Sequence, residues 1–300
     1  MATHDLRTLL DGFSFGEGPR WRDGALWFSD MHGHRVLRVV TDGREARSVE
    51  TVVEITDDDP SGLGWLPDGR LLVVAMESQQ LRRVEPDGTV VVHADLSSAA
   101  RGDLNDMIVG ADGTAYVGDM GARIQSGGAG REMVPGQTFR VAPDGSWSQA
   151  ADDLQAPNGH VLSDDGRTLI VAESGGSRLT AFAVAPGGTL SDRRTFAELV
   201  PAAGAAIPVA PPDGICLDAE GAVWVADPIG RRVFRVREGC EVTDSIAFPD
   251  AVPVACVLGG DGRRTLMMCV ADDWKRDALA GRQTGRIVTT AVDVPGAGRP

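Results

Sequence analysis

Short apolar runs recur along this chain, and most of them follow a turn of the Asp-Gly type. Three examples are A-L-W-F at 25–28, L-L-V-V-A at 71–75 and V-W-V-A at 223–226. Runs of this length, bounded by turn-forming residues, are typical of β-strands. Apolar residues at helical spacing are nearly absent, so the pattern predicts an all-β protein.

A longer unit repeats six times: a polar residue, an apolar residue four positions later, a turn that ends in glycine, and a hydrophobic strand. The turn glycines are Gly24, Gly69, Gly113, Gly166, Gly221 and Gly262. They recur at intervals of about 41 to 55 residues, close to the period of one propeller blade. A third strand of alternating character follows, as in R-V-L-R-V-V at 35–40, so each unit forms a four-stranded antiparallel meander.

Six such units predict a single six-bladed β-propeller domain over residues 1–300. Six meanders stacked around one axis close on themselves and protect most strand edges. In this arrangement, residues 1–14 or the strand at 286–293 complete the last blade by pairing across the closure. A solenoid built from the same repeats is the structural alternative.

The polar residue of the repeat predicts a metal site. Aligning the units places six residues at one equivalent position, named here the inner column: Glu17, Ser61, Asn105, Asn158, Asp213 and Val254. Side chains at one height around an axis converge, and four of these six offer the oxygen ligands that hard cations prefer. We therefore expect one divalent metal ion at the mouth of the central channel, held by Glu17, Asn158 and Asp213, with Asn105 as a fourth ligand. Ca²⁺ fits this set best, and Mg²⁺, Mn²⁺ and Zn²⁺ are the alternatives.

Polar residues next to glycine can also be explained by turn formation alone. Asx and Glu before glycine commonly only begin a turn, and agreement in register across four units argues against that explanation for the inner column. A second set of acidic residues ends the second strands, and we expect it to cap turns. This set is Asp30, Asp119, Glu173 and Asp227.

Several motifs together resemble a known family. They are F-G-E-G-P-R-W at 15–21, N-D-M at 105–107, A-P-N-G at 156–159 and P-D-G-I-C-L-D at 212–218. Over nearly its whole length the chain resembles the regucalcin/gluconolactonase (senescence marker protein) propellers, with diisopropylfluorophosphatase as a more distant relative. The resemblance implies metal ligands at Glu17, Asn158 and Asp213, and a substrate pocket that includes Asn105 and Asp106.

One position departs from the family pattern. Sugar-acid lactonases of the family carry an arginine two residues before that asparagine, and this chain has Asp103 there, with Arg101 two residues further back. The departure argues against an aldonolactone substrate more than against the metal site. The candidates for substrate binding are Asn105, Asp103 and Arg101.

The resemblance implies hydrolysis of a lactone or similar ester. A metal ion would polarise the carbonyl group, and a carboxylate beside it would accept the proton of the attacking water. Asp213 is the first candidate for this base, and Asp106 and Asp103 are the next. Asp213 could instead attack directly and form a covalent intermediate. His160 lies two residues after Asn158, so strand alternation puts it on the same face. It is either an acid–base residue or a packed histidine.

Two rival functions remain open at this stage. A phosphotriesterase-like hydrolase could use the same metal to polarise a P=O group. A non-catalytic calcium-binding scaffold would use the metal only to hold the blades. The glycine-containing segment 120–137 is either a lid over the pocket or a disordered insert. The apolar segment 201–212 is a candidate pocket wall, which would suit a substrate less polar than a sugar lactone.

Composition narrows the partners to a small molecule. The net charge of −14 and the lack of a basic run argue against nucleic-acid binding. No apolar run approaches the length of a membrane span, and the first residues lack a signal-peptide pattern, so we expect a cytoplasmic protein. Cys216, Cys240, Cys256 and Cys269 show no C-x-x-C spacing and are expected to be buried free thiols. The sequence leaves the oligomeric state open.

Overall fold

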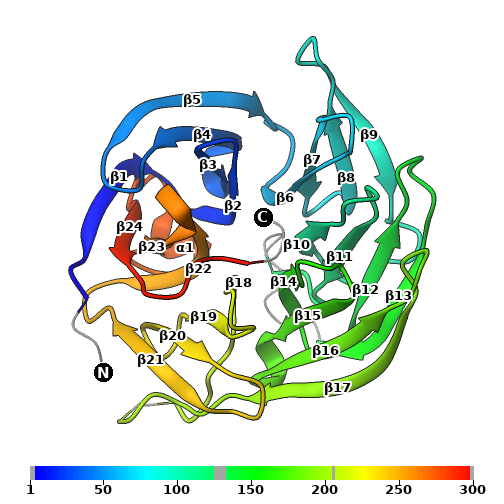
Figure 1. The fold of residues 1–300 in the computed structure, drawn as a ribbon. Helices are drawn as coiled ribbons and strands as arrows, with labels where there is room; N and C mark the ends of the chain where they lie inside the picture. The colour runs from blue at the N-terminus through cyan, green and yellow to red at the C-terminus, as the bar shows by residue number, and fades with distance from the viewer. Residues whose placement is uncertain (1–3, 125–132, 205–206, 298–300) are drawn as a thin grey trace.

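The chain folds into six four-stranded antiparallel sheets around a central axis (Figure 1). The computed structural model describes residues 4–124, 133–204 and 207–297. Each sheet is one blade, and the innermost strands of neighbouring blades contact one another. The arrangement confirms the predicted six-bladed propeller and rules out the solenoid.

The blades follow one another along the chain. The first three contain β2 (Gly16–Arg22), β3 (Ala25–Asp30), β4 (Arg35–Thr41) and β5 (Ala46–Glu54); β6 (Pro60–Trp65), β7 (Leu71–Ala75), β8 (Gln80–Val84) and β9 (Val90–Asp95); and β10 (Leu104–Val109), β11 (Ala115–Asp119), β12 (Gly136–Val141) and β13 (Trp147–Leu154). The next two contain β14 (Pro157–Leu162), β15 (Thr168–Glu173), β16 (Arg178–Val184) and β17 (Leu190–Glu198); and β18 (Ile215–Leu217), β19 (Val223–Asp227), β20 (Arg232–Val236) and β21 (Val242–Ala247).

The sixth blade is built from both ends of the chain. It contains β22 (Val252–Gly259), β23 (Thr265–Ala271), β24 (Gly285–Ala291) and, outermost, β1 (Arg7–Phe13). Strand β1 pairs antiparallel with β24, from Arg7 opposite Thr289 to Phe13 opposite Gly285. Both predicted closing segments therefore take part, and they pair with each other.

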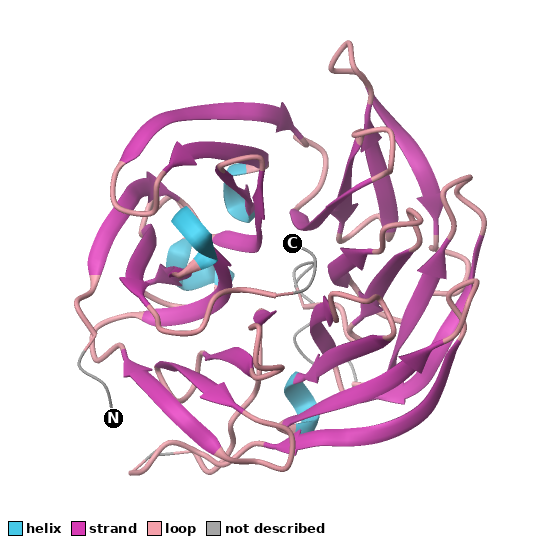
Figure 2. Cartoon of the chain, viewed as in Figure 1, coloured by secondary structure: helices cyan, strands magenta, loops and turns pink. Residues whose placement is uncertain are grey.

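Helical structure is confined to four short segments in the described part of the chain (Figure 2). They are the 3₁₀ turns Met31–Gly33, Ser174–Gly176 and Asp261–Arg263, and helix α1 (Arg276–Leu279). None of the helices in the described residues is long and apolar enough to cross a membrane.

The repeated Asp-Gly pairs form the hairpin turns that the sequence predicts. Gly69 and Gly113 have φ angles of +89° and +84°, which glycine adopts without the steric cost of a Cβ atom. The aspartate before each glycine caps its own turn. Asp68 Oδ1 accepts a hydrogen bond from the Arg70 amide at 3.1 Å, and Asp112 Oδ1 accepts one from the Thr114 amide at 3.0 Å.

Small residues let the blades meet closely at the axis. The residue after each inner-column position is Gly18, Gly62, Asp106, Gly159, Gly214 or Ala255. A Cβ atom at Gly62 would lie 2.4 Å from the Met107 nitrogen of the next blade, and one at Gly214 would lie 2.5 Å from the Ala255 Cβ. The amide of Gly214 also donates to the Val254 carbonyl at 2.8 Å, so neighbouring inner strands are joined by backbone.

The last described residues cover the far end of the channel. The amide of Ala297 donates to the Leu217 carbonyl at 3.0 Å, and the amide of Ala219 donates to the Pro295 carbonyl at 2.8 Å. Leu217 ends an inner strand, whereas the inner column lies where the inner strands begin. The inner column therefore faces the opposite mouth of the channel.

Apolar contacts between blades form the core, and three cysteines belong to it. Cys216, Cys256 and Cys269 are buried free thiols, as predicted, but Cys240 is exposed. The Sγ atoms of Cys216 and Cys256 lie 3.6 Å apart on neighbouring inner strands. Cys240 lies in a turn with a φ angle of +80°, outside the apolar strands, which explains the difference.

Candidate functional site

A cavity of about 240 Å³ opens at the mouth where the inner strands begin. Four inner-column residues line it: Glu17, Asn105, Asn158 and Asp213. They come from four different blades and span almost two hundred positions of sequence. Ser61, also in the column, lies behind them and donates from Oγ to Asn105 Oδ1 at 2.9 Å.

Two carboxylates dominate the electrostatics of this cavity. Burial raises the pKa of Glu17 well above its usual value, and the negative charges of Asp213 and Asp106 raise it further. Burial is also the largest cause that raises the pKa of Asp213, to about 7. Without a cation, these raised pKa values favour protonation of both carboxyl groups, and a bound cation would favour their ionised forms instead.

The two amides of the cavity face different partners. Asn158 hydrogen-bonds Asp213 through its side chain, while its buried Oδ1 atom has no hydrogen-bond partner. An amide oxygen buried without a partner is costly unless a ligand satisfies it. Asn105 differs, because its Oδ1 atom is engaged by Ser61 and its Nδ2 atom lies 3.4 Å from Met120 Sδ. It presents N–H groups toward the cavity.

These groups fit a hard cation. Two carboxylates and one free amide oxygen give the all-oxygen set that Ca²⁺ or Mg²⁺ prefers, with further positions left for water or substrate. The described residues contain no group of three or more His, Cys, Asp or Glu side chains arranged to hold a metal. Because the polar residues at the cavity floor offer oxygen ligands and no His or Cys side chain, their chemistry favours an oxygen-seeking ion over Zn²⁺.

Asp106 lies beneath the cavity and does not line it. Its Oδ1 atom accepts a hydrogen bond from Arg20 at 2.7 Å, with both side chains buried, and its Oδ2 atom accepts one from the His160 amide at 3.2 Å. Asp106 stands where four other blades have glycine, and its backbone lies close to Gly62 of the preceding blade. Both of its oxygens are already engaged.

His160 is packed among neutral partners. Its Nδ1 atom lies 2.6 Å from the Asn158 carbonyl oxygen and its Nε2 atom lies 3.2 Å from Thr138 Oγ1. Burial lowers the pKa of His160 to about 4. The ring is therefore neutral near pH 7 and faces a small cavity farther down the channel, which matches the packed alternative for this residue.

The other two candidates for substrate binding do not line the cavity either. Asp103 is fully buried, lies 3.3 Å from the Arg123 guanidinium and accepts a hydrogen bond from the Ile124 amide at 2.6 Å. Arg101 turns outward to Asp152, at 2.6 Å, and to the Pro135 carbonyl. The acidic residues that end the second strands cap turns, as predicted; Asp30 Oδ1, for example, accepts from the Ser14 amide at 2.8 Å.

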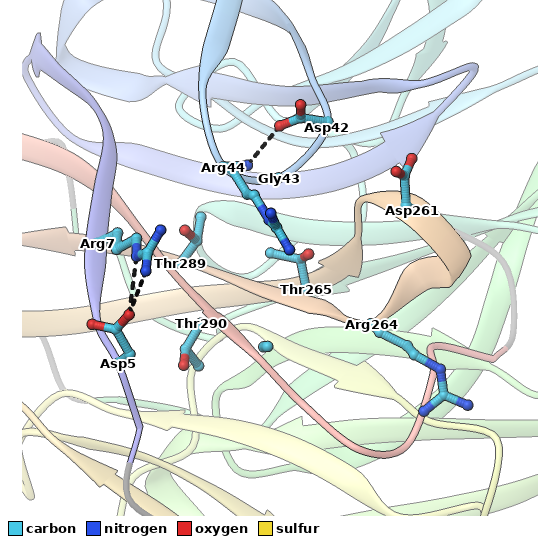
Figure 3. Close-up of a pocket in the computed structure, with 11 residues that line it drawn as sticks. Asp5, Arg7, Asp42, Gly43, Arg44, Asp261, Arg264, Thr265, Thr289 and Thr290 are labelled. Carbon is cyan, nitrogen blue, oxygen red and sulfur yellow. Dashed lines mark hydrogen bonds and ion pairs between the residues drawn. The ribbon is translucent and has the colours of Figure 1, made fainter.

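A larger cavity lies elsewhere, on the outer seam between the first and sixth blades (Figure 3). Its volume is about 660 Å³, and it contains no inner-column residue. Arg7 pairs with Asp5 at 2.6 Å, and Asp42 Oδ1 accepts from the Arg44 amide at 2.9 Å. Because these acidic groups already have partners at the protein surface, the channel mouth is the stronger candidate.

Comparison with known proteins shows the family of this chain. The family model described as "SMP-30/Gluconolactonase/LRE-like region" matches residues 15–272. The chain belongs to this family. The match covers all six inner strands, so it includes every residue of the inner column.

Individual members are distant. Regucalcin of Xenopus laevis is 27% identical over 89% of this chain and 88% of its own length. L-arabinolactonase of Azospirillum brasilense is 27% identical over 83% of this chain and 79% of its own. A solved structure of a gluconolactonase from Xanthomonas campestris has a TM-score of 0.73 and 25% identity, and covers 97% of this chain and 90% of that one.

This member of the SMP-30/gluconolactonase family also has a second set of site residues that the sequence analysis missed. The residue directly after the second strand lines the cavity in five blades; these residues, named here the rim column, are Met31, Met76, Met120, Ser174 and Pro228. The same repeat alignment could have found them, because each follows the hydrophobic strand directly. Four of the five are apolar and gave no chemical signal.

The remaining wall comes from loops. Phe15, Ile124, Pro211, Pro212, Ile229 and Trp274 complete the lining. The expected apolar wall at 201–212 is therefore present at its last two residues, next to Asp213. Of the segment 120–137 that was considered as a lid, Met120 and Ile124 line the cavity, and residues 125–132 lie outside the described part of the chain.

Proposed function

We propose that this protein is a metal-dependent hydrolase that opens the ring of a small lactone at the channel mouth. The observation that carries the proposal is the convergence of Glu17, Asp213 and the unpartnered Asn158 Oδ1 in one buried cavity. Membership of the SMP-30/gluconolactonase family and the lactonase names among its relatives support the reaction type.

Glu17, Asn158 and Asp213 would hold the cation, with Ca²⁺ as the first candidate. A divalent ion at this position supplies positive charge that polarises a carbonyl group and lowers the cost of charge that develops on its oxygen. The same residues have their pKa values or hydrogen bonding perturbed in a way that a cation relieves.

The protein's own groups have distinct tasks in this proposal. Asn105 donates from Nδ2 to an oxygen of the lactone, because its own carbonyl is occupied by Ser61. A carboxylate oxygen of Asp213 accepts the proton of the attacking water, because Asp213 lines the cavity and both oxygens of Asp106 are engaged. The walls exclude bulk water from the ring, and Arg20 keeps Asp106 in place beneath it.

The test is hydrolysis of a panel of γ- and δ-lactones and an aryl phosphotriester by protein stripped with EDTA and resupplied with Ca²⁺, Mg²⁺, Mn²⁺ or Zn²⁺. We expect lactone turnover that depends on the added ion. We expect Asp213→Asn to abolish turnover, and Glu17→Gln to raise the metal concentration that half-maximal turnover requires. Asp250→Asn changes an exposed carboxylate outside the cavity and serves as the matched control.

Other outcomes would replace the proposal. Turnover of the phosphotriester alone would make the protein a phosphotriesterase-like hydrolase. A rise in melting temperature with Ca²⁺ but no turnover of any substrate would indicate a calcium-binding scaffold. Normal lactone turnover by both Asp213→Asn and Glu17→Gln would remove the site assignment.

A further inference from the structure

The walls of the channel-mouth cavity are almost free of hydrogen-bonding groups. Ten of its fifteen lining residues are apolar. Four of the five polar ones, Glu17, Asn105, Asn158 and Asp213, belong to the inner column at its floor. The fifth, Ser174, uses its hydroxyl to donate to the Pro212 carbonyl at 2.6 Å. A ligand above the floor therefore meets thioether, proline and aromatic surface.

No basic side chain lines this cavity among the described residues. Two arginines of the third blade, one in the loop before β10 and one in the loop after β11, are paired elsewhere. Arg101 pairs with Asp152 at 2.6 Å, and Arg123 donates to the Glu77 carbonyl at 2.6 Å and lies 3.3 Å from Asp103. A carboxylate or a phosphate on the ligand would thus find no countercharge on the walls.

Buried acidic groups hold two parts of the apolar wall in place. Asp103 accepts a hydrogen bond from the Ile124 amide at 2.6 Å and so fixes the loop that carries Ile124. Asp59 pairs with Arg276, at 2.5 Å, two residues after Trp274. Blade 3 thus holds the loop that carries Ile124, and blade 2 holds the loop that carries Trp274. Both parts of the apolar wall are fixed to the blades by these contacts.

We propose that the lactone taken by this cavity carries an alkyl or aryl substituent in place of the hydroxyl groups of a sugar. This inference rests on the proposed function. The ring oxygens lie at the floor with the inner column, and the substituent lies against the methionines and Trp274. Unbranched thioether side chains adapt their shape to the ligand, so substituents of different length can be accommodated.

The energetic argument compares two kinds of substituent. Each hydroxyl placed against these walls gives up its hydrogen bonds to water without a replacement, which weakens binding. Each methylene placed there is removed from water, which strengthens binding by about fourfold. Compared with an unsubstituted lactone ring, a polyhydroxylated lactone should therefore bind more weakly and an alkyl lactone more tightly.

The first experiment measures kcat/KM for γ-butyrolactone, γ-hexalactone, γ-octalactone and glucono-δ-lactone with the metal-loaded protein. We expect kcat/KM to rise by about fourfold per methylene until the cavity is filled. We expect kcat/KM for glucono-δ-lactone to be lower than kcat/KM for γ-hexalactone. Faster turnover of glucono-δ-lactone than of every alkyl lactone would overturn the inference and leave the lactonase proposal intact.

A second experiment separates this inference from catalysis. 2-Alkylcyclopentanones, which cannot be hydrolysed, are titrated into the protein by calorimetry. We expect Kd to decrease with alkyl length whether or not any lactone is turned over. A lack of turnover would refute the proposed reaction and leave this inference intact. A Kd that is independent of alkyl length would overturn the apolar-substituent inference.

The matched variants are Trp274→Ser and Met133→Ser. Trp274 lines the cavity and is 47% exposed, so its replacement leaves the packed blades intact. Met133 is 59% exposed and does not line it. We expect Trp274→Ser to reduce the gain per methylene to about twofold or less and Met133→Ser to leave it unchanged. Equal gains in both variants would contradict the assignment of the wall.

Discussion

The carboxyl groups of Glu17 and Asp213 are costly to ionise in the absence of a bound ion. Glu17 is buried and Asp213 is half-buried, and the negative charge of Asp213 raises the cost of ionising Glu17. Arg20 sits close by but is already paired with Asp106. Residues that lower stability in this way are retained at sites where they bind something.

A stability measurement can therefore expose the site without any substrate. In protein stripped of metal and at a pH above about 7, Asp213→Asn should raise the melting temperature by about 2–4 °C, because the neutral amide removes the cost of ionising the Asp213 carboxyl in the fold. With saturating Ca²⁺, the wild-type protein should gain melting temperature and the variant should gain less. Differential scanning calorimetry of both proteins, with and without Ca²⁺, measures this. A variant that melts lower than wild type without metal and gains equally from Ca²⁺ would contradict the site.

At the residue scale, the pairing of Arg20 with Asp106 marks what could not be predicted, whereas the rim column was within reach of the repeat alignment. The inner column was predictable because each unit carries its polar residue at the same distance from an apolar position and a turn. Arg20 and Asp106 lie 86 residues apart and occupy different places in their repeats. No alignment of units connects them, and only the closed ring brings them together.

At the scale of the element, the inner strands matter most. Their dipeptides, such as Glu17-Gly18 and Asp213-Gly214, suggest turn starts when read locally. In the structure the glycine serves a different purpose, since it lets one inner strand approach the backbone of the next. The polar residue and the glycine therefore act together, because close approach of the strands is what brings the polar side chains into one cavity.

Gly62→Ala tests this contact directly. The new Cβ atom would lie 2.4 Å from the Met107 nitrogen, and backbone cannot move aside cheaply. We expect a loss of about 2–4 kcal/mol in the free energy of unfolding, measured by urea denaturation. The control is Gly176→Ala, where the nearest atom would lie 3.4 Å away, at an ordinary contact distance. Similar losses in both variants would mean that the inner strands are not in close contact.

Blade number, strand order and turn positions were all predictable because they depend on local signals repeated along the chain. The residues of the cavity walls were harder to predict from the sequence. Segment 201–212 carries an apolar composition that indicated a wall, and Pro211 and Pro212 do line the cavity. Trp274 lies in the connection between β23 and β24, whose sequence does not follow the repeat, so its place over the mouth follows only from contacts such as that of Arg276 with Asp59.

At the scale of the whole molecule, the ring is held shut by strand β1. Phe13 of this strand is 1% exposed and lies 4.8 Å from the ring of Phe28 in the first blade. Strand β1 pairs with β24 and so belongs to the sixth blade. Phe13 thus joins the last blade to the first.

The closure predicts unequal effects for two positions in the same strand. Phe13→Ala should cost about 3–5 kcal/mol of unfolding free energy, because it empties a buried contact between blades. Asp11→Ala, at an exposed position, should change it by no more than about 0.5 kcal/mol. Guanidinium unfolding followed by tryptophan fluorescence measures both. Two small and equal effects would show that the first and last blades are sealed by other contacts.

The pairing of β1 with β24 also sets the order of events during synthesis. A ribosome releases residues 7–13 early and residues 285–291 only about 270 residues later. Until then β1 has no hydrogen-bonding partner, and apolar Leu9 and Phe13 lack their cover in the nascent chain. Contacts between such distant residues form slowly. The sixth blade is therefore the last to assemble, and a truncated translation product carries an unsealed ring.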